Sequence, residues 1–484
     1  MKISVKRGNL LEQKTDLAIL FVKQDADLPG ALTGLFEKAD FSGKPKQSLL
    51  VYTQATTAPA RVLLVGLGEA DKVKADTYRN AAAIAVKKAL KLKVDQVAVE
   101  VAGESGLDAK TISQAIIEGL ALGSYRFLDY KTDLKEDDTF EIKEVVIIST
   151  DTKAASEGAA NGEAIAAGVI LARDLVNGPG VDVTPARFGE EAMAMVERLG
   201  IKSIVLGLDE LEEQGFGGVI AIGKASANQP RFVVMEYGIP SDGIPTICLV
   251  GKGLSFDSGG LNIKPAEAMV AMKSDMGGAA TVFGTMEAVA RLKLPVHLVG
   301  IVPAAENMPG PNAVRPGDIV KSLSGKTIEI LNTDAEGRVI LADGIHYAHR
   351  YNPAAIINFA TLTGAMIIAL GYHATGLMST DDALTEKIKA AGERSAEGVW
   401  ELPMWPEYHE MVKSDIADVK NLAGRPAGSI TAATFLAAFA GDYPFAHLDI
   451  AATGWLDTPN KAYHQKGGTG VGVRLMVEYL KNLN

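Results

Sequence analysis

Three short, glycine-rich segments hold the residues of this sequence whose types and spacing could do chemistry. The first, residues 249–260, is an apolar run that ends in a turn carrying one lysine, Lys252, and one carboxylate, Asp257. Ligands bind at the carboxyl ends of strands in open α/β sheets, and glycine lets the backbone approach a ligand closely. The turn lacks the GlyLysSer or GlyLysThr ending of a phosphate-binding loop. The segment therefore indicates a ligand site of another kind.

Two further segments add carboxylates. Asp275 precedes a double glycine that is expected to open a helix, where an aspartate capping the helix at the surface is an equally good interpretation. Asp334 and Glu336 follow the apolar run 328–331 and are two residues apart, so on an extended backbone they point the same way, with Arg338 on the same face. Two carboxylates aimed together repel each other unless cations lie between them. Taken alone, a solvated, salt-bridged turn is the alternative.

The three segments together favour a metal site. Each follows a strand signal and is embedded in glycine and other small residues rather than in an ordinary surface composition. Hard oxygen ligands, without cysteine and without a clustered histidine pair, suit Mg, Mn or Zn in a carboxylate site. The seven histidines are scattered and none forms an HisGluXaaXaaHis motif; His346 and His349 have the spacing of a helix surface.

The segments that must position these residues alternate between strand and helix signals. A chain of 484 residues is too long for one ordinary core, which predicts two domains. Each is expected to be an α/β domain with a mixed β-sheet flanked by helices, and the larger domain, which carries the three segments, is expected to be C-terminal. We expect an N-terminal domain over residues 1–150, a connecting helix over 151–175 and the larger domain over 176–484.

Apolar runs rich in β-branched residues predict strands, and a period of 3.6 residues predicts helices. In the first domain, strands are expected at residues 1–8, 17–22, 61–65, 96–101 and 144–148, and helices at 77–92 and 109–122. In the second domain, strands are expected at 246–250, 296–301 and 355–359, and a helix at 279–292. The GlyLeuGly at residues 66–68 is half of a dinucleotide fingerprint, for which a plain strand-end turn is the better interpretation.

Charge and cysteine content narrow the class of protein. The formal net charge of −11 argues against a phosphate backbone as partner, so nucleic acid is not favoured. The single cysteine, Cys248, cannot form an internal disulfide, which indicates a reducing compartment. The first residues alternate between polar and apolar types, unlike a signal peptide, and polar residues interrupt the apolar stretch 354–371, unlike a membrane span. We therefore expect a cytoplasmic protein.

The motif AsnThrAspAlaGluGlyArg at residues 332–338 resembles the signature of the leucyl aminopeptidase family, the M17 cytosol aminopeptidases. Residues 250–260 and 272–280 resemble the other two metal-binding motifs of that family. The resemblance covers essentially the whole second domain, through further segments at 172–177, 361–365, 447–451 and 468–474. The first domain resembles the family only in layout. The family often has an asparagine where this chain has Val181, a departure remote from the metal motifs.

This resemblance implies a leucyl aminopeptidase, a metallo-exopeptidase that releases leucine and other apolar residues from the N-termini of peptides with a metal-activated water. It implies two divalent metal ions per subunit, Mn or Zn, with Mg and Co as alternatives. The metal ligands that it assigns are Lys252, Asp257, Asp275, Asp334 and Glu336. Of these, Asp257 and Glu336 would bridge the two metals, Asp334 would bind one metal, and Lys252 and Asp275 would bind the other.

The resemblance also implies catalytic and substrate-binding residues. Lys264, which has few carboxylate neighbours in the sequence, would polarise the scissile carbonyl and stabilise the oxyanion. Arg338 would hold an anion, bicarbonate in the family, that moves the proton as general base. Met272, Thr361 and Gly364 would form the pocket for an apolar first side chain; for these three, ordinary core positions are the alternative.

Two other functions stay open on the residues alone. Carboxylate-held metal pairs also serve two-metal phosphoesterases, and a nucleic-acid-binding regulator is the non-enzymatic alternative. The resemblance itself implies peptide substrates and a homohexamer built as two trimers. A closed assembly suits a peptidase that must spare folded proteins. No membrane partner is expected.

Overall fold

The chain folds into two compact units. The computed structural model describes residues 1–54, 57–101, 106–241 and 243–483. The first unit comprises Met1–Ala166 with Pro459–His464, and the second comprises Ala167–Thr458 with Gln465–Asn484. This division falls inside one long helix, α4 (Thr152–Asn177). The functional boundaries expected at residues 150 and 176 stay predictions.

The first unit is built on one six-stranded sheet. In the order of their hydrogen bonding, its strands are β1 (Lys2–Lys6), β6 (Glu144–Ser149), β5 (Gln96–Val101), β2 (Leu17–Lys23), β4 (Arg61–Gly68) and β3 (Ser48–Tyr52). All neighbours are parallel except β3 and β4. Its helices are α1 (Ala75–Lys91), α2 (Ala109–Ser124) and α3 (Glu136–Thr139), of which α1 and α2 pack against each other. The strands and helices expected in this part of the chain are present.

The two glycines of the GlyLeuGly motif serve close packing at the end of β4. A Cβ atom on Gly66 would lie 2.0 Å from the carbonyl oxygen of Lys44, and Gly68 has a φ of +84°. Glycine alone meets both conditions without strain. Strand packing therefore accounts for this motif, in line with the strand-end interpretation.

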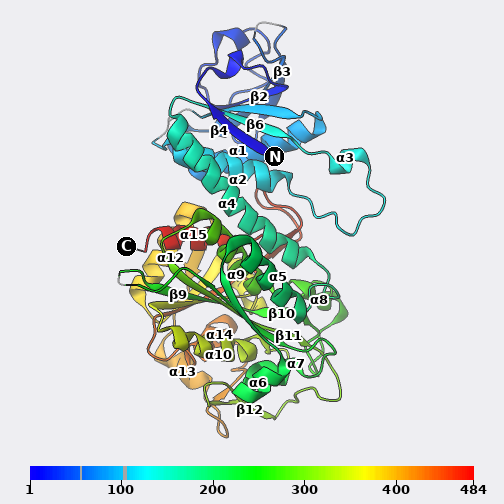
Figure 1. Cartoon of the computed structure of the whole chain (residues 1–484), viewed down its shortest axis with the longest axis vertical. Helices are drawn as coiled ribbons and strands as arrows, with labels where there is room; N and C mark the ends of the chain where they lie inside the picture. The colour runs from blue at the N-terminus through cyan, green and yellow to red at the C-terminus, as the bar shows by residue number, and fades with distance from the viewer. Residues whose placement is uncertain (55–56, 102–105, 242, 484) are drawn as a thin grey trace. The chain divides into compact units, whose positions relative to one another are not determined.

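The second unit is built on a nine-stranded sheet (Figure 1). Its strand order is β16 (Val399–Glu401), β15 (Thr375–Ser379), β18 (Phe445–Asp449), β14 (Ala355–Ala360), β9 (Thr246–Gly251), β11 (His297–Asn307), β8 (Arg231–Tyr237) and β7 (Lys202–Leu206), with β10 (Gly253–Asp257) paired to β11. The central strands β18, β14, β9, β11 and β10 run parallel, and antiparallel strands flank them. The expected fold class, two mixed α/β parts with the larger one C-terminal, is confirmed.

Helices cover both faces of this sheet (Figure 1). On one face α9 (Gly277–Leu292) lies against β9, β11 and β14 and packs with α5 (Pro185–Leu199) and α15 (Val473–Lys481). On the other face α10 (Gly337–Tyr347) lies against β9 and β11 with α7 (Gly217–Gly223) and α14 (Gly428–Ala437). The remaining helices and strands of this unit are α6 (Leu208–Gln214), α8 (Ala266–Met269), α11 (Gly364–Leu370), α12 (Asp382–Ser395), α13 (Pro406–Met411), β12 (Ile319–Lys321), β13 (Thr327–Glu329), β17 (Val419–Lys420), β19 (Trp455–Leu456) and β20 (Gly467–Gly468).

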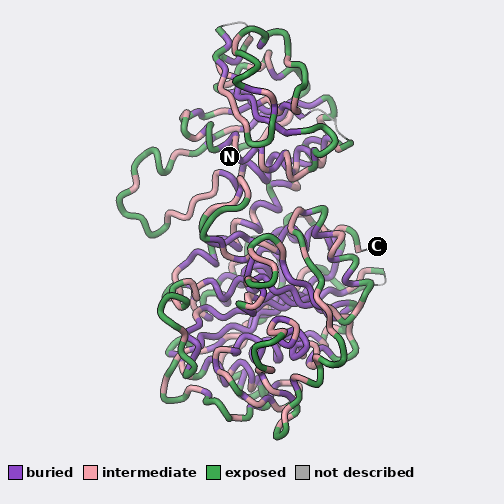
Figure 2. Tube along the Cα trace, turned by 180° about the vertical axis from the view of Figure 1, so that it is seen from behind, coloured by how far each residue is buried: buried purple, intermediate pink, exposed green. Residues whose placement is uncertain are grey.

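The central strands are buried on both sides (Figure 2). Such strands are continuous apolar runs, which is why the sequence predicted β9 and β14 within one residue of their bounds. The strand expected at 296–301 runs on to Asn307, past Pro303, a residue that ordinarily argues against a central strand. None of the helices in the described part of the chain combines the length and the apolar character that a membrane crossing needs.

Candidate metal centre

The carboxyl ends of the central strands bring several predicted residues together. Lys252 directly follows β9, and Asp257 is the last residue of β10. Thr361 directly follows β14, in which the carbonyl oxygen of Phe359 accepts a hydrogen bond from the Lys252 backbone N–H at 3.0 Å. Because parallel strands end at the same edge of a sheet, these side chains start from neighbouring backbone positions.

Two helix beginnings supply further carboxylates. Glu336 occupies the N-terminal cap position of α10, and Asp275 lies just before Met276, which occupies the cap position of α9. Asp275 is only 5% exposed, so its interpretation as a surface cap is wrong. Helix α9 can approach the sheet closely because Gly278 has no side chain. A Cβ atom there would lie 2.1 Å from the carbonyl oxygen of Phe359. The double glycine is thus what brings Asp275 against the strand ends.

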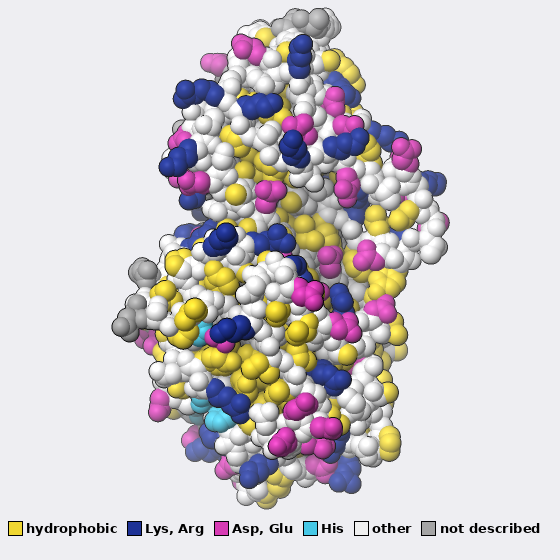
Figure 3. Space-filling view, viewed as in Figure 1, with side chains coloured by type: hydrophobic (Ala, Val, Ile, Leu, Met, Phe, Trp, Pro, Cys, Tyr) yellow, Lys and Arg dark blue, Asp and Glu magenta, His cyan; other side chains and the backbone are white. Residues whose placement is uncertain are grey.

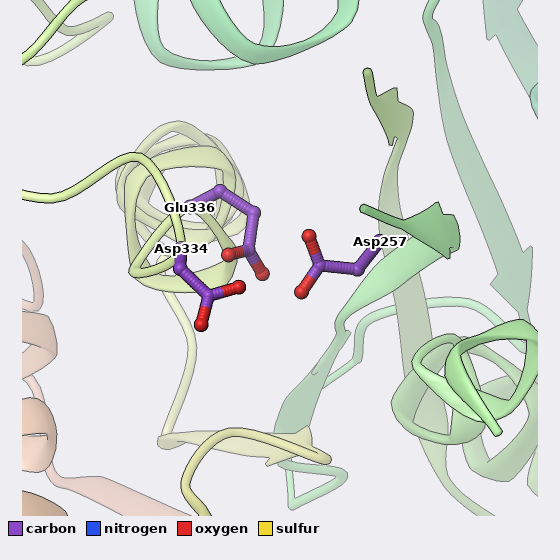
Figure 4. Close-up of side chains that lie close together, drawn as sticks. All are labelled: Asp257, Asp334 and Glu336. Carbon is purple, nitrogen blue, oxygen red and sulfur yellow. The ribbon is translucent and has the colours of Figure 1, made fainter. Parts of the chain in front are cut away.

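The carboxylates of Asp257, Asp334 and Glu336 converge (Figure 4). One oxygen atom from each lies within 4.8 Å of those of the other two. They come from the end of β10, from the turn before α10 and from the start of α10. Ionised carboxylates at this separation repel one another unless cations lie among them.

Lys252 is held between two carboxylates. Its Nζ lies 2.7 Å from Asp275 Oδ2 and 3.0 Å from Glu336 Oε1, and it donates a hydrogen bond to the carbonyl oxygen of Thr361 at 3.2 Å. The hydroxyl of Thr361 donates in turn to Asp275 Oδ1 at 2.7 Å. Burial disfavours the charged amine, but the charges of Asp275 and Glu336 outweigh burial and raise the pKa of Lys252.

Lys264 approaches the same cluster from its other side. Its Nζ lies 2.8 Å from Asp257 Oδ2 and 2.5 Å from Asp334 Oδ1. Burial opposes the charge, and the carboxylates, Asp257 first, outweigh it and raise the pKa of Lys264. Lys264, which has few carboxylate neighbours in the sequence, therefore contacts two carboxylates in space, and the sequence did not predict these contacts.

The composition of the cluster fits divalent metal ions. Four carboxyl groups share it with two ammonium groups. Burial first, and then the charges of Glu336 and Asp275, raise the pKa of Asp257. Oε2 of Glu336 is buried and has no hydrogen-bond partner among the described residues. A buried charged oxygen without a partner is costly unless a cation binds it. Carboxylate oxygens are the donors that hard divalent ions take.

Arg338 is a buried cation beside the cluster, in the first turn of α10. Burial lowers the pKa of its guanidinium to about 10, against the charges of Glu336 and Asp449, which raise it. Its Nε has no hydrogen-bond partner in the described part of the chain. A buried guanidinium with an open donor can hold a small anion.

His447 is a neutral imidazole near Arg338. Burial, and then the charge of Arg338, lower its pKa to about 3. Its Nδ1 lies 2.6 Å from Asn358 Oδ1, and the Asn358 amide nitrogen donates to the carbonyl oxygen of Val250 at 2.8 Å, so the imidazole must donate through Nδ1. Nε2 is then an acceptor, and no described residue donates to it. The sequence motifs assign no role to His447.

The backbone that presents Asp334 and Glu336 differs from the expected one. An extended strand was expected to run from residues 328–331 into the motif, whereas β13 ends before the motif begins. Glu336 has helical angles, φ −78° and ψ −35°. Arg338 lies inside the helix, where residues two apart point to different sides. The expectation of one shared strand face is therefore wrong, and a turn followed by a helix start produces the convergence instead.

The three predicted pocket residues lie around Asp275 and the adjoining helix α11. Thr361 contacts the Asp275 carboxylate directly. Met272 opens a short 3-10 helix, and its carbonyl oxygen accepts from the backbone N–H of Asp275 at 3.3 Å. Gly364 begins α11, and a Cβ atom there would meet no atom within 4 Å, so this position borders open space. A cavity of about 930 Å³ lined in part by Trp400 contains none of the predicted site residues.

Asn307 and Asp449 belong to the site, although the sequence motifs assign neither of them a role. Asn307, the last residue of β11, donates to Asp257 Oδ1 at 2.8 Å. Asp449, the last residue of β18, accepts from the hydroxyl of Thr363 at 2.7 Å. Both residues show the same sequence feature as Asp257: each is a polar residue at the carboxyl end of an apolar strand. An asparagine does not match a pattern of carboxylates among glycines.

Models of both domains of one protein family match the chain. The catalytic-domain model of the cytosol aminopeptidase family matches residues 170–477, and its N-terminal-domain model matches residues 10–134. A probable cytosol aminopeptidase of Roseiflexus castenholzii is 52% identical over 484 residues, which cover 100% of this chain and 99% of that protein. One of Geobacter sulfurreducens is 45% identical, covering 96% of this chain and 93% of its own length.

Solved structures of related proteins match nearly the full length of the chain. The bottromycin maturation enzyme BotP in complex with Mn has a TM-score of 0.87 at 37% identity, covering 97% of this chain and 99% of that chain. A tomato leucine aminopeptidase mutant has a TM-score of 0.88 at 32% identity, covering 99% and 96%. The matched family models, the full-length relatives and the acidic cluster agree: this chain belongs to the cytosol aminopeptidase (M17) family and is a metal-dependent hydrolase that removes residues from the N-termini of peptides.

Proposed function

We propose that this chain is a leucyl aminopeptidase with two divalent metal ions, Mn or Zn, in each subunit. The observation that carries the proposal is the convergence of the Asp257, Asp334 and Glu336 carboxylates within 4.8 Å. Asp257 and Glu336 would bridge the two metals. Magnesium and cobalt are alternative occupants of the same oxygen-rich site.

The two remaining carboxylates are assigned to different metals. Asp334 contacts Lys264, whereas Asp275 contacts Lys252, which supports placing them on different sides of the bridging pair. Lys252 would join Asp275 as a ligand. A lysine binds a metal only as the neutral amine, and a dication beside a buried lysine lowers its pKa enough for that.

Lys264 and Arg338 would be the side chains that act directly in catalysis, beside the bound metals. Bound metals would supply a water that is nucleophilic near neutral pH. The side chain of Lys264 is 15% exposed, so it reaches the open side of the cluster and would donate to the scissile carbonyl as negative charge develops on its oxygen. Arg338 would hold bicarbonate through its open Nε, at the place where a proton leaves the attacking water.

Substrate choice would follow from the residues next to Asp275. Met272, Thr361 and the open space at Gly364 would receive an apolar first side chain such as leucine. A peptide N-terminus offers a free α-amine that an internal peptide bond lacks, which is why a site of this kind trims chain ends.

The surroundings of the enzyme are also part of the proposal. Relatives named cytosol aminopeptidases support a cytoplasmic location and peptide substrates. The homohexamer is proposed on the family resemblance of the sequence. A second role as a nucleic-acid-binding regulator has little support, because the net charge is −11 and acidic side chains are interspersed with basic ones on the face seen in Figure 3.

One experiment tests the central claim against the phosphoesterase alternative. Purified protein is analysed for metals and then assayed on a panel of aminoacyl anilides and on an aryl phosphate. We expect Mn or Zn at two ions per subunit, the highest turnover on the leucine anilide and no turnover of the phosphate. Full peptidase activity after exhaustive chelation would overturn the two-metal mechanism, and hydrolysis of the phosphate alone would overturn the peptidase.

A further inference from the structure

Asn307 lies at the carboxyl end of a central strand, beside the carboxylate cluster. It is the last residue of β11 and stands opposite Asp257, the last residue of β10, in the parallel register of these strands. It is 2% exposed. The carbonyl oxygen of Asn307 accepts from both the backbone N–H and the hydroxyl of Ser258, at 3.0 and 2.7 Å, so its backbone is fixed.

The side-chain amide of Asn307 joins two segments of the metal centre. Its Nδ2 donates to Asp257 Oδ1 at 2.8 Å and to the carbonyl oxygen of Thr333 at 2.9 Å. The backbone carbonyl of Thr333 can only accept, so the orientation of the amide is unambiguous. Thr333 directly precedes Asp334, which means that one amide ties the β10 carboxylate to the turn carrying the next one.

The amide also determines which oxygen of Asp257 is available. Oδ1 accepts from Asn307 and from the backbone N–H of Gly259 at 2.9 Å, so neutral donors occupy it. Oδ2 faces the cluster and lies against Lys264. An amide supplies these donations without adding charge, whereas a carboxylate at residue 307 would repel Asp257 and an apolar side chain would leave two buried acceptors short of a donor.

The turn that carries Asp334 is fastened by a second set of bonds. Thr333 Oγ1 donates to the carbonyl oxygen of Gly259 at 2.7 Å, and it accepts from the backbone N–H of Asn262 at 2.9 Å. These bonds hold the two loops together even when the Asn307 amide is absent. Removal of that amide should therefore disturb the orientation of the carboxylates more than the course of the chain.

We infer that Asn307 is a positioning residue that sets the orientation of Asp257 and its distance from the Asp334 turn, and thereby the affinity of the centre for divalent metal. The inference rests on the proposed metal binding by these carboxylates. Groups that orient metal ligands typically contribute about 10–100-fold to metal affinity. The affinity of the metal-free protein for Mn²⁺ is accordingly the quantity that Asn307 controls.

The test is a titration of metal-free protein with Mn²⁺ by calorimetry. Asn307→Leu keeps the approximate volume and removes both donations; Asn307→Ser is the gentler variant, too short to reach both acceptors. We expect the Kd for Mn²⁺ to rise by about 10–100-fold in both. We also expect high Mn²⁺ concentrations to restore the turnover of a leucine anilide, since Asn307 does not itself touch substrate.

Glu306→Gln is the matched control on the same strand end. Its carboxylate accepts from Ser226 and Asn228, and as the adjacent strand residue it points to the opposite face. We expect its Kd for Mn²⁺ to stay within about threefold of the parent value, because no hydrogen bond to the carboxylate cluster is changed.

Each possible outcome decides the matter. An Mn²⁺ affinity equal to that of the parent in Asn307→Leu and Asn307→Ser would overturn the inference. An equal loss of Mn²⁺ affinity in Glu306→Gln would also overturn it, because it would indicate a general disturbance of the strand end. Unfolding of both Asn307 variants, with the control folded, would make Asn307 a residue of the fold instead. A parent protein that binds no Mn²⁺ would overturn the proposed function itself, so the two failures are distinguishable.

Discussion

Lys252 and Lys264 are alike in charge and different in surroundings. Lys252 is buried between Asp275 and Glu336 and bonds to a backbone carbonyl, while Lys264 keeps part of its side chain exposed on the far side of the carboxylates. A ligand must be fixed among the other ligands, whereas a group that meets the substrate must reach open space. These surroundings support the different roles proposed for the two lysines.

Substitutions at residues 336 and 264 should separate metal binding from catalysis. Glu336→Ala removes a proposed bridging carboxylate, so metal and activity should be lost together. Lys264→Ala should retain its metals, because it removes a competing cation from Asp257, while turnover of a leucine anilide falls by about 10²–10³ with the loss of one oxyanion donor. Metal content and turnover are measured on the same preparations.

Arg338→Ala should behave as an intermediate case. Its metals should be retained, and turnover should fall less than in Lys264→Ala if neighbouring groups still hold the anion. Metal analysis of the three variants decides the assignment. Loss of metal from Lys264→Ala to the extent seen for Glu336→Ala would show that Lys264 is a ligand or a structural residue.

Asp343 gives the fold a pH dependence that is separate from the metal centre. Its carboxyl is buried and accepts from the backbone N–H groups of Leu323 at 2.7 Å and Val219 at 2.9 Å. Burial raises its pKa from 3.8 to about 7, against these hydrogen bonds. The folded state therefore holds the proton more tightly than the unfolded state. The stabilisation that comes from this tighter proton binding is fully present below the pKa of the unfolded state. It is lost as the pH rises through the folded-state pKa of about 7.

Asp343→Asn should lower the free energy of unfolding at pH 5 by about 1–3 kcal/mol, because an amide nitrogen cannot accept from a backbone N–H. The advantage of the parent over the variant should shrink between pH 5 and 7, by at most about 1.4 kcal/mol per pH unit. Urea unfolding between pH 5 and 7 measures the difference in free energy of unfolding and its change with pH.

Asp418→Asn is the control, because this exposed carboxylate has a lowered pKa and stays ionised throughout this pH range. An advantage that grows with pH would contradict the argument.

At the scale of elements, burial decided what the sequence could predict. Strands such as β9 and β14 are apolar throughout, so periodicity and composition located them. The local backbone of the site was less predictable, since Glu336 belongs to a helix start and the partners of Lys264 are brought together only by the tertiary fold. Asn307 was not predicted because its strand was expected to end at residue 301, whereas β11 runs on to Asn307. Residue types therefore indicated the chemistry, and packing determined the geometry.

The approach of α9 to the sheet is an element-scale feature that a single methyl group should disrupt. A Cβ atom on Gly278 would lie 2.1 Å from the carbonyl oxygen of Phe359 and 2.7 Å from the backbone nitrogen of Lys252. Gly278→Ala should push the helix away, destabilise the protein by about 1–3 kcal/mol and lower peptidase activity by separating Asp275 from Lys252. Thermal unfolding and turnover measure these effects.

Gly398→Ala is the matched control for this substitution. A Cβ atom on Gly398 would meet no atom within 4 Å, so the same added methyl group should be tolerated there. Stability and activity unchanged in Gly278→Ala would mean that the close approach of α9 is not needed for the site. Equal losses in both variants would trace the effect to the general cost of replacing glycine.

At the scale of the whole molecule, the proposed hexamer predicts a mass in solution of about six times 50.9 kDa. Large apolar side chains are exposed on the second unit, among them Trp400, Trp405 and Ile368, and exposed apolar surface of this kind often marks an interface. Light scattering coupled to size exclusion at working concentration measures the mass. A monomer under these conditions would contradict the assembly.

The two compact units should also respond differently to metal. Each has hydrophobic core clusters of its own, and all proposed ligands lie in the second unit. A ligand that binds only the folded form stabilises it by about 2.7 kcal/mol at a hundredfold excess over its Kd. In calorimetry of metal-free protein we expect two unfolding transitions, of which added Mn²⁺ raises one by several degrees, while Glu336→Ala shows no such shift. A single transition that Mn²⁺ shifts as a whole would mean that the two units unfold as one body. A parent protein without any shift would argue against the metal centre, since the buried Oε2 of Glu336 would then lack the cation that explains it.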